Sequence, residues 1–272
     1  MSCHLSASIV LYYQSLELFQ RVFQNFLCSN RNIRNRFHRS HLYLVDNGGS
    51  IETLSYIKNQ EQSWMACMHL ECITEQNNIG FGKAHNLCID RTSANYHLIL
   101  NPDVELAPDA LINAITFLES HPECGLLSPK STDTKNQQQF LCKRYPAISD
   151  LLLRGLAPEW IKRIFQKRLD LYEMKDVVGD NIYWDPPIVS GCFMLFRTSV
   201  LKQLGGFDPR FFLYFEDFDL SLRASRITRI AYVPSVKIVH HGGNAARKGI
   251  RHIFFFLESA VKFFNKHGWK FF

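Results

Sequence analysis

Acidic residues and histidines follow apolar runs at three places in this sequence. Asp103 follows the run HLIL, Glu216 and Asp217 lie within FEDFDL, and His240 and His241 end the run SVKIVHH. Carboxylate oxygens, sometimes joined by an imidazole, hold a divalent cation that carries a diphosphate. A carboxylate near such a cation can also act as the general base that activates a nucleophile. These positions are therefore candidates for a metal-dependent phosphate site.

Asp103 has the most constrained surroundings of these candidates. Pro102 cannot donate a hydrogen bond to a sheet, so the strand before it must end, and it restricts Asn101 to extended geometry. Asp103 should therefore lie at the carboxyl end of a strand, where open α/β sheets bind their ligands. The alternative is an ordinary turn, because Asn, Pro and Asp are all turn formers.

The other two positions also have structural readings. Asp217 could be a charge at a helix start that complements the helix dipole. A single histidine at a strand end is more often a surface or core residue than a ligand. The adjacent pair His240 and His241, followed by Gly242 and Gly243, favours a functional reading of that strand end.

The segment NIGFGKAHN is a glycine-bearing loop that enters a helix. It matches only half of a G-x-G-x-x-G fingerprint, because His85 stands where the third glycine would be, so it is a weak signal for dinucleotide binding. The glycines could instead let the backbone approach the sugar or base of a nucleotide. Neither a P-loop nor a G-x-S-x-G motif occurs.

Strand and helix signals alternate from residue 6 to about residue 129. This alternation predicts an α/β fold with a mostly parallel central sheet flanked by helices. Ser15 is the expected N-cap of the first helix. We also predict one buried strand for IVSGCFMLFRTSV, a surface loop for SPKSTDTKNQQQF, and a helical, apolar and basic segment over residues 150–176.

The composition narrows the classes of partner and compartment. The chain has 272 residues, of which 46% are hydrophobic, and a formal net charge of +6, which suits an anionic partner. The basic residues are dispersed and match no nucleic-acid-reading motif, so nucleic-acid binding is the weaker alternative. Eight cysteines without a C-x-x-C pair, no signal-peptide pattern and no long apolar run predict a cytoplasmic protein that is soluble or peripheral to a membrane.

The C-terminal residues form an amphipathic pattern. At helical spacing one apolar stripe contains Ile250, Ile253, Phe254, Leu257, Val261 and Phe264. The opposite side holds Arg251, Lys262 and Lys266, with Phe255 among them. The stripe could dock against the core, whereas the additional aromatic and basic residues favour a helix at a membrane interface.

Six motifs in one order resemble the family 2 glycosyltransferases of the GT-A fold, and the bacterial rhamnosyltransferases of O-antigen and cell-surface glycan synthesis above all. The motifs are LVDNGGS, NNIGFGKAHN, LILNPDVEL, VSGCFMLFR, GGFDPRFFLYFEDFDLSLR and VPSVKIVHHGG. The resemblance covers nearly the whole chain. It implies a GT-A catalytic domain over residues 1–245, with a nucleotide-binding half to about residue 130 and an acceptor half after it, and a C-terminal helix over residues 246–272.

The resemblance also implies roles for individual residues. Asp103 and His240 would bind Mg²⁺ or Mn²⁺, with His241 as the alternative ligand, and Asp217 beside Glu216 would be the catalytic base. Asn101 stands where the family often has a second acidic ligand, so its amide would contact the sugar or a water. The implied nucleotide contacts are Asp46, Asn47, Gly80, Gly82, Asn86 and Asn101. The candidates for phosphate or acceptor contacts are Ser190, Gly191, Arg247 and Lys248.

The implied reaction is a single displacement that inverts the anomeric carbon. The resemblance implies dTDP-rhamnose as the donor and a polyprenyl-diphosphate-linked sugar as the acceptor, at the inner face of the cytoplasmic membrane. A UDP-hexose or UDP-galactofuranose donor is the first alternative. A non-catalytic domain of the same fold is another, which the presence of Asp103, Asp217 and His240 disfavours.

Overall fold

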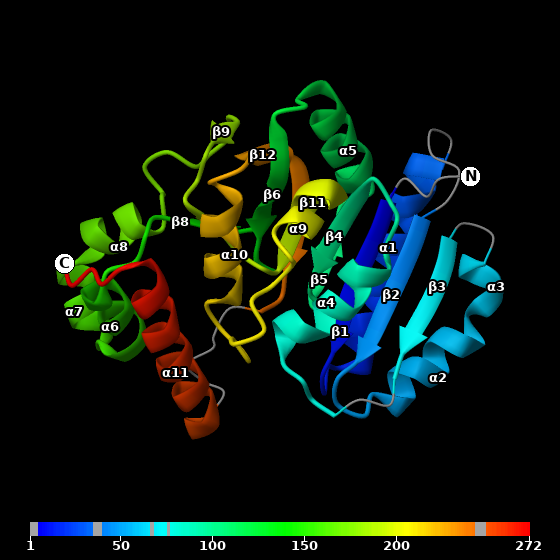
Figure 1. The fold of residues 1–272 in the computed structure, drawn as a ribbon, viewed down its shortest axis with the longest axis horizontal. Coiled ribbons are helices and arrows are strands. Elements are labelled where there is room, and N and C mark those ends of the chain that lie inside the picture. Colours follow the sequence, from blue (N-terminus) through cyan, green and yellow to red (C-terminus); the bar gives the residue numbers. More distant parts are fainter. Residues whose placement is uncertain (1–4, 35–39, 66–67, 75–76, 243–248) are drawn as a thin grey trace.

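A computed structural model describes residues 5–34, 40–65, 68–74, 77–242 and 249–272 (Figure 1). Its centre is a mixed sheet whose main path runs β3-β2-β1-β4-β11-β6-β12-β5. Six of these strands run parallel to one another: β1 (Leu5–Leu11), β2 (Ser40–Asp46), β3 (Met68–Ile73), β4 (Tyr96–Leu100), β6 (Cys124–Thr132) and β12 (Arg229–His240). The antiparallel members are β5 (Val104–Leu106) and β11 (Phe193–Arg197). The predicted α/β fold with a mostly parallel sheet is confirmed.

Four short strands lie off the main path. Two of them pair with its strands, β7 (Gln138–Gln139) with β6 and β9 (Tyr183–Trp184) with β12. In the described part of the chain the other two, β8 (Cys142–Lys143) and β10 (Ile188–Val189), pair with each other in a separate sheet.

Helices cover both faces of the sheet. The bounds of the described helices are α1 (Leu16–Arg34), α2 (Ile51–Asn59), α3 (Glu61–Trp64), α4 (Phe81–Arg91), α5 (Ala110–Ser120), α6 (Ile148–Leu156), α7 (Glu159–Ile164), α8 (Gln166–Tyr172), α9 (Thr198–Gln203), α10 (Glu216–Ala224) and α11 (Ile250–His267). One apolar core contains residues of α1, α2 and α5, and another contains residues of α4, α9 and α10. The N–H of Leu18 donates to the Ser15 hydroxyl at 3.4 Å, so the expected N-cap of α1 is confirmed.

Alternating side chains of the strands serve the two cores. In β4, Leu98 and Leu100 face the α1 side, whereas Ile99 faces the side of α9 and α10. This alternation follows from the two-residue repeat of a strand. The polar residues that follow the apolar strands lie at the edge of the sheet, outside both cores.

Two sequence-based assignments of secondary structure are wrong. The segment IVSGCFMLFRTSV is divided, because β10 ends at Val189, β11 begins at Phe193 and helix α9 begins at Thr198. The segment SPKSTDTKNQQQF is largely paired, because β6 continues to Thr132 and β7 returns along it. In both cases partners elsewhere in the chain decided the structure, which a local polarity pattern does not report.

The C-terminal segment packs along α10 and α6, at the end of the molecule where Figure 1 shows α11 in red. Phe263 and Phe264 are buried there, whereas Phe254 and Leu257 remain exposed. Phe255, which the helical projection places among basic residues, packs on the loop before α10, since its ring centre lies 4.7 Å from that of Phe212. Helix α11 therefore has a docked face and a free apolar face. None of the helices in the described ranges is both long and apolar enough to cross a membrane.

Candidate functional site

The candidate residues gather at one edge of the sheet. Strands β2 and β4 run toward this edge and end there, whereas the antiparallel strand β11 begins there, since Phe193 pairs with Leu100. Strand β12 ends at the same edge, where His240 pairs with Val104. The topology thus joins segments that are far apart in the sequence (Figure 1).

Asp103 and His240 face each other at this edge. The Nε2 atom of His240 lies 3.6 Å from Oδ1 of Asp103. The Nδ1–H of His240 donates to Oε1 of Gln139 at 3.1 Å, and Gln139 in turn donates to the His240 carbonyl at 3.1 Å. These two contacts hold the ring so that Nδ1 lies against Gln139 and Nε2 faces Asp103.

His241 is used differently. Its Nε2 atom lies 2.8 Å from Oε1 of Glu105, and its backbone N–H donates to the Asp103 carbonyl at 3.0 Å. The Glu105 carboxylate also accepts a hydrogen bond from Asn25 of α1 at 2.9 Å. His241 therefore ties the end of β12 to α1 and to the Asp103 turn, and its ring is engaged away from Asp103.

The Asp103 and His240 pair fits a hard divalent cation. Among the described residues, Oδ1 of Asp103 and Oδ1 of Asn101 are buried without a hydrogen-bond partner. A Cβ atom at Gly242 would lie 2.4 Å from Oδ2 of Asp103 and 2.9 Å from Nε2 of His240, so only glycine leaves this space open. No group of three or more acidic, histidine or cysteine ligands occurs in the described part of the chain. Oxygen atoms of a bound diphosphate and water molecules would therefore complete the coordination of the cation, as is common for Mg²⁺.

Asp217 lies in the first turn of α10, against the start of β11. Its Oδ2 accepts the N–H of Gly191 at 2.8 Å and its Oδ1 accepts the N–H of Phe218 at 2.9 Å. A Cβ atom at Gly191 would lie 3.0 Å from that of Asp217, so glycine permits this close approach. Burial raises the pKa of Asp217, which brings the carboxyl closer to the basicity of a general base.

Glu216 points into the protein beside Asp217. Burial raises its pKa well above the ordinary value, and the negative charge of Asp217 raises it further. Its Oε2 is one of the described buried atoms without a hydrogen-bond partner.

Asp46 and Asn47 end β2 at the same edge. Oδ1 of Asp46 accepts the N–H groups of Gly48 at 3.2 Å and Ser50 at 3.0 Å. The Asn47 amide accepts the N–H of Ile79 at 3.0 Å and donates to Asn78 at 2.9 Å. Asn47 thus joins the end of β2 to the loop that precedes α4.

The NIGFGKAHN segment packs tightly on a second loop of residues 206–212. Gly80 has φ +89°, and a Cβ there would lie 2.4 Å from the Phe212 carbonyl, while a Cβ at Gly82 would lie 2.8 Å from that of Phe207. The Asn86 amide donates to the Phe207 carbonyl and accepts its N–H, both at 2.8 Å. These contacts position the loop of residues 206–212, and they use both polar groups of Asn86.

Ser190, Arg247 and Lys248 are the remaining candidates for phosphate or acceptor contacts. The N–H of Ser190 donates to the Leu141 carbonyl at 3.0 Å, and its hydroxyl accepts the N–H of Cys192 at 3.4 Å. Arg247 and Lys248 lie outside the described residues. Reasoning from the sequence missed Gln139 and Glu105, whose contacts orient the two histidines. Their only sequence signal is a polar side chain in a short strand, which is too common to single them out.

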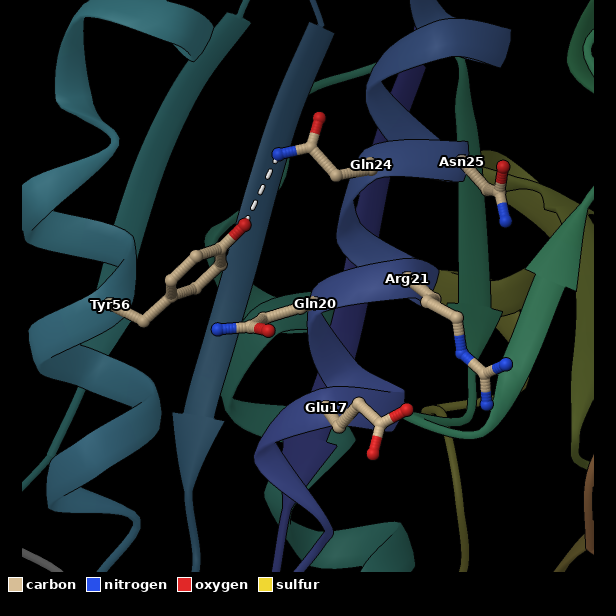
Figure 2. A pocket seen from close by; sticks show the side chains of 6 residues that line it. All are labelled: Glu17, Gln20, Arg21, Gln24, Asn25 and Tyr56. Carbon is tan, nitrogen blue, oxygen red and sulfur yellow. Dashed lines mark hydrogen bonds between the residues drawn. The ribbon is translucent and has the colours of Figure 1, made fainter.

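A shallow groove of about 460 Å³ lies between α1 and α2. Figure 2 shows Gln24 reaching across it to the Tyr56 hydroxyl, at 3.1 Å. Glu17, Gln20 and Arg21 line the same groove. It is open and polar and contains none of the candidate residues, so we assign the site to the sheet edge.

The sequence comparisons agree with the expected family. The model of the family described as "Glycosyltransferase like family 2" matches residues 20–252. Rhamnosyltransferase WbbL of Escherichia coli (strain K12) is 28% identical over 173 residues, covering 60% of this chain and 61% of that protein. N-acetylglucosaminyl-diphospho-decaprenol L-rhamnosyltransferase of Mycobacterium tuberculosis (strain CDC 1551 / Oshkosh) is 29% identical over 186 residues, covering 60% of this chain and 56% of that protein. The chain thus spans about three fifths of these relatives.

Solved structures share the fold at low sequence identity. The mannosyltransferase PcManGT from Pyrobaculum calidifontis, in complex with GDP-Man and Mn²⁺, has a TM-score of 0.61 at 18% identity, covering 96% of this chain and 65% of that chain. GalNAc-T7 with UDP, GalNAc and Mn²⁺ has a TM-score of 0.64 at 13% identity, covering 97% of this chain and 48% of that chain. Both structures contain a nucleotide and Mn²⁺, and both have the GT-A fold.

Proposed function

The chain belongs to glycosyltransferase-like family 2, and from this premise we propose that it transfers a sugar from a nucleoside-diphosphate donor to an acceptor hydroxyl. One observation carries the proposal. The carbonyl of Cys192 accepts the N–H of Asn101 at 2.9 Å, and the N–H of the neighbouring Gly191 donates to Asp217 at 2.8 Å. The start of β11 therefore links the Asp103 turn to the carboxylate of Asp217.

In the proposed reaction Asp217 is the general base. It takes the proton of the acceptor hydroxyl while that oxygen attacks the anomeric carbon from the side opposite the leaving diphosphate. One displacement inverts the configuration, and no covalent intermediate on the chain is needed. Asp103 and His240 would hold Mg²⁺ or Mn²⁺, which offsets the negative charge of the departing diphosphate. The proposed nucleotide contacts are Asp46, Asn47, Gly80, Gly82 and Asn101, while Asn86 holds the loop of residues 206–212 beside them. Ser190 and Gly191 line the acceptor side.

For the donor we propose dTDP-rhamnose, and for the acceptor a sugar on a polyprenyl diphosphate. The support is that two relatives are rhamnosyltransferases, one of which is named for a decaprenol-linked acceptor sugar. A UDP-hexose or UDP-galactofuranose is the alternative donor, since solved structures of the same fold hold GDP-Man or UDP. A lipid-linked acceptor places the proposed role in O-antigen or other surface-polysaccharide synthesis.

We further propose that the protein is peripheral on the inner face of the cytoplasmic membrane. The free face of α11 exposes Ile253, Phe254, Leu257 and Val261, by 47% to 67% of their surface. Trp269, whose ring stacks on that of Phe264 at 5.3 Å, is a further exposed aromatic residue near the end of the chain. Nearby helices α6 to α8 add further exposed apolar and basic side chains: Leu152, Trp160, Ile164, Phe165, Arg163 and Lys167. Apolar groups beside basic ones suit an anionic lipid surface.

The transfer reaction can be tested with purified protein, Mn²⁺ and a panel of nucleotide sugars. A lipid-linked acceptor and a short water-soluble analogue would be offered separately. We expect release of dTDP and formation of a rhamnosylated product that depends on the acceptor. If the protein uses a UDP-sugar and does not use dTDP-rhamnose, that UDP-sugar becomes the assigned donor. Absence of turnover with every donor, together with salt-sensitive nucleic-acid binding, would overturn the proposal.

The membrane role can be tested by co-sedimentation with anionic vesicles. Phe254→Ser combined with Leu257→Ser removes apolar surface from the free face of α11 and should lower binding. Ile51→Ser is the matched control, because Ile51 is 73% exposed on the distant helix α2. Equal binding of both variants and the wild type would reject this face as the membrane contact.

A further inference from the structure

Two consecutive residues shortly before the proposed base Asp217 have a left-handed backbone conformation. Tyr214 has φ +69° and Phe215 has φ +62°, and Glu216 and Asp217 follow at once. Bulky L-residues rarely adopt this conformation, because Cβ crowds the backbone. Such strain persists only where the surroundings hold it in place. The direction of the first turn of α10 therefore depends on what packs against these two residues.

The docked face of α11 supplies that packing. The ring of Phe215 has its centre 5.1 Å from Phe256 and 5.2 Å from Phe263, and Phe215 is only 3% exposed. The Tyr214 hydroxyl is hydrogen-bonded to Nδ1 of His252 at 2.8 Å. Both strained residues are thus held by side chains of the same helix.

Polar contacts from α11 hold the backbone of the same loop. The hydroxyl of the buried Ser259 donates to the Leu213 carbonyl at 2.8 Å. Lys262 donates to the Arg210 carbonyl at 2.8 Å. These two carbonyls lie in an irregular loop, outside the helices and sheets, so the hydrogen bonds from α11 restrict the conformation of this loop.

The last turn of α11 is joined to α10 by a buried carboxylate. Asp219, which is fully buried, lies 2.8 Å from His267 and 2.5 Å from Lys266 of α11. Its other oxygen is 2.8 Å from Arg223 of α10. A buried carboxylate is tolerated only with such partners, so separation of the two helices would be costly. Helix α11 is therefore anchored at the loop before α10 and at α10 itself.

We infer that α11 is a positioning element for Asp217, which it orients by holding Tyr214 and Phe215 in their strained conformation. This inference rests on the proposed function, because it takes Asp217 as the general base. The key positioning residue is Phe263, which is fully buried against Phe215. The free face of α11, which contains Val261, takes no part in this role. Phe263 itself touches no substrate in the proposed mechanism.

The test compares Phe263→Ala with Val261→Ala, using a water-soluble acceptor so that membrane contact has no influence. Misplacement of a reacting group by about 1 Å can cost about 100-fold in rate. We expect Phe263→Ala to lower kcat at least tenfold while donor KM stays within about twofold. Val261→Ala should leave both constants unchanged. A folded Phe263→Ala protein with a lower Tm but unchanged kcat would show a merely structural role and overturn the inference.

A second background separates this inference from the proposed function. If Phe263 acts through Asp217, Phe263→Ala should have no further effect on the residual rate of an Asp217→Asn protein. A full additional loss in that background would overturn the positioning role. Wild-type activity of Asp217→Asn alone would instead refute Asp217 as the base. If Phe263→Ala does not fold, Ser259→Ala decides the question by the same kcat and KM criteria, since it removes only the bond to Leu213.

Discussion

The Nε2 atom of His240 lies 3.6 Å from Oδ1 of Asp103, across the ends of two strands that are remote in the sequence. Two ligands of one octahedral cation at about 2.1 Å lie roughly 3 Å apart. The pair is therefore close to the separation that a shared cation requires, and only small side-chain movements are needed.

Asp103→Ala should abolish metal-dependent transfer. The substitution removes the only carboxylate of the proposed cation pair, so the affinity for Mn²⁺ should fall as well. Turnover at saturating Mn²⁺ and Mn²⁺ binding by electron paramagnetic resonance would measure the two effects. Asp90→Ala, at an exposed position of α4, is the control. Activity within a few-fold of the wild type would remove Asp103 from the metal site.

Gly242→Ala should impair the same site without removing a ligand. Its Cβ would lie 2.4 Å from Oδ2 of Asp103, so the carboxylate or the strand end must shift. We expect weaker Mn²⁺ binding and a lower kcat with nearly unchanged Tm. Gly155→Ala is the matched control, since a Cβ there meets nothing within 4 Å. Unchanged Mn²⁺ affinity in Gly242→Ala would show that this space is not used by a cation.

Asp217→Asn should lower kcat by about 10² to 10⁴-fold while donor binding stays largely intact. The amide keeps the shape of the side chain but cannot accept the proton. The base must be ionised, and burial raises its pKa. The kcat/KM of the wild type should therefore fall on acidification, and the decline should begin at a higher pH than the pKa of an exposed aspartate would give. Isothermal titration with donor would check binding. A parallel collapse of donor affinity would make Asp217 a donor or metal contact instead.

The buried histidine His97 should make the fold sensitive to acid. Its ring nitrogens lie 2.7 Å from the Ser6 hydroxyl and 2.9 Å from that of Ser8, and burial lowers its pKa from 6.5 to about 3. Below pH 6.5 the unfolded chain therefore binds a proton that the folded chain excludes, so stability falls as the pH drops toward 3. Between pH 6.5 and 5 this group alone should cost about 2 kcal/mol.

Urea denaturation at several pH values would measure this effect. His97→Gln should be less stable at pH 7, yet should lose less stability than the wild type when the pH is lowered to 5. Burial also lowers the pKa of His85, and His97 lowers it further, so the variant should keep part of the pH dependence. An identical pH dependence in wild type and variant would contradict the assignment.

Local patterns in the sequence were sufficient for much of the fold. Alternating apolar and amphipathic segments predicted the parallel strands and their helices, because the periods of strand and helix are properties of the local chain. The same reasoning failed for the segment around Ser190. There the strand is interrupted at residues 190–192, where the N–H of Gly191 donates to Asp217 of a distant helix, a contact that no local pattern reports.

The sequence by itself determined which side chains stand at the ends of the strands. Carboxyl ends of parallel strands meet at one edge, so Asp103 was expected at the ligand-binding edge of the sheet without any tertiary information. Its role in the reaction remains a prediction. Tertiary structure alone decided that His240 turns toward Asp103 while His241 turns toward Glu105. It also decided which face of α11 docks, because adjacent side chains have similar local signals and only the pairing and packing of distant segments distinguishes them.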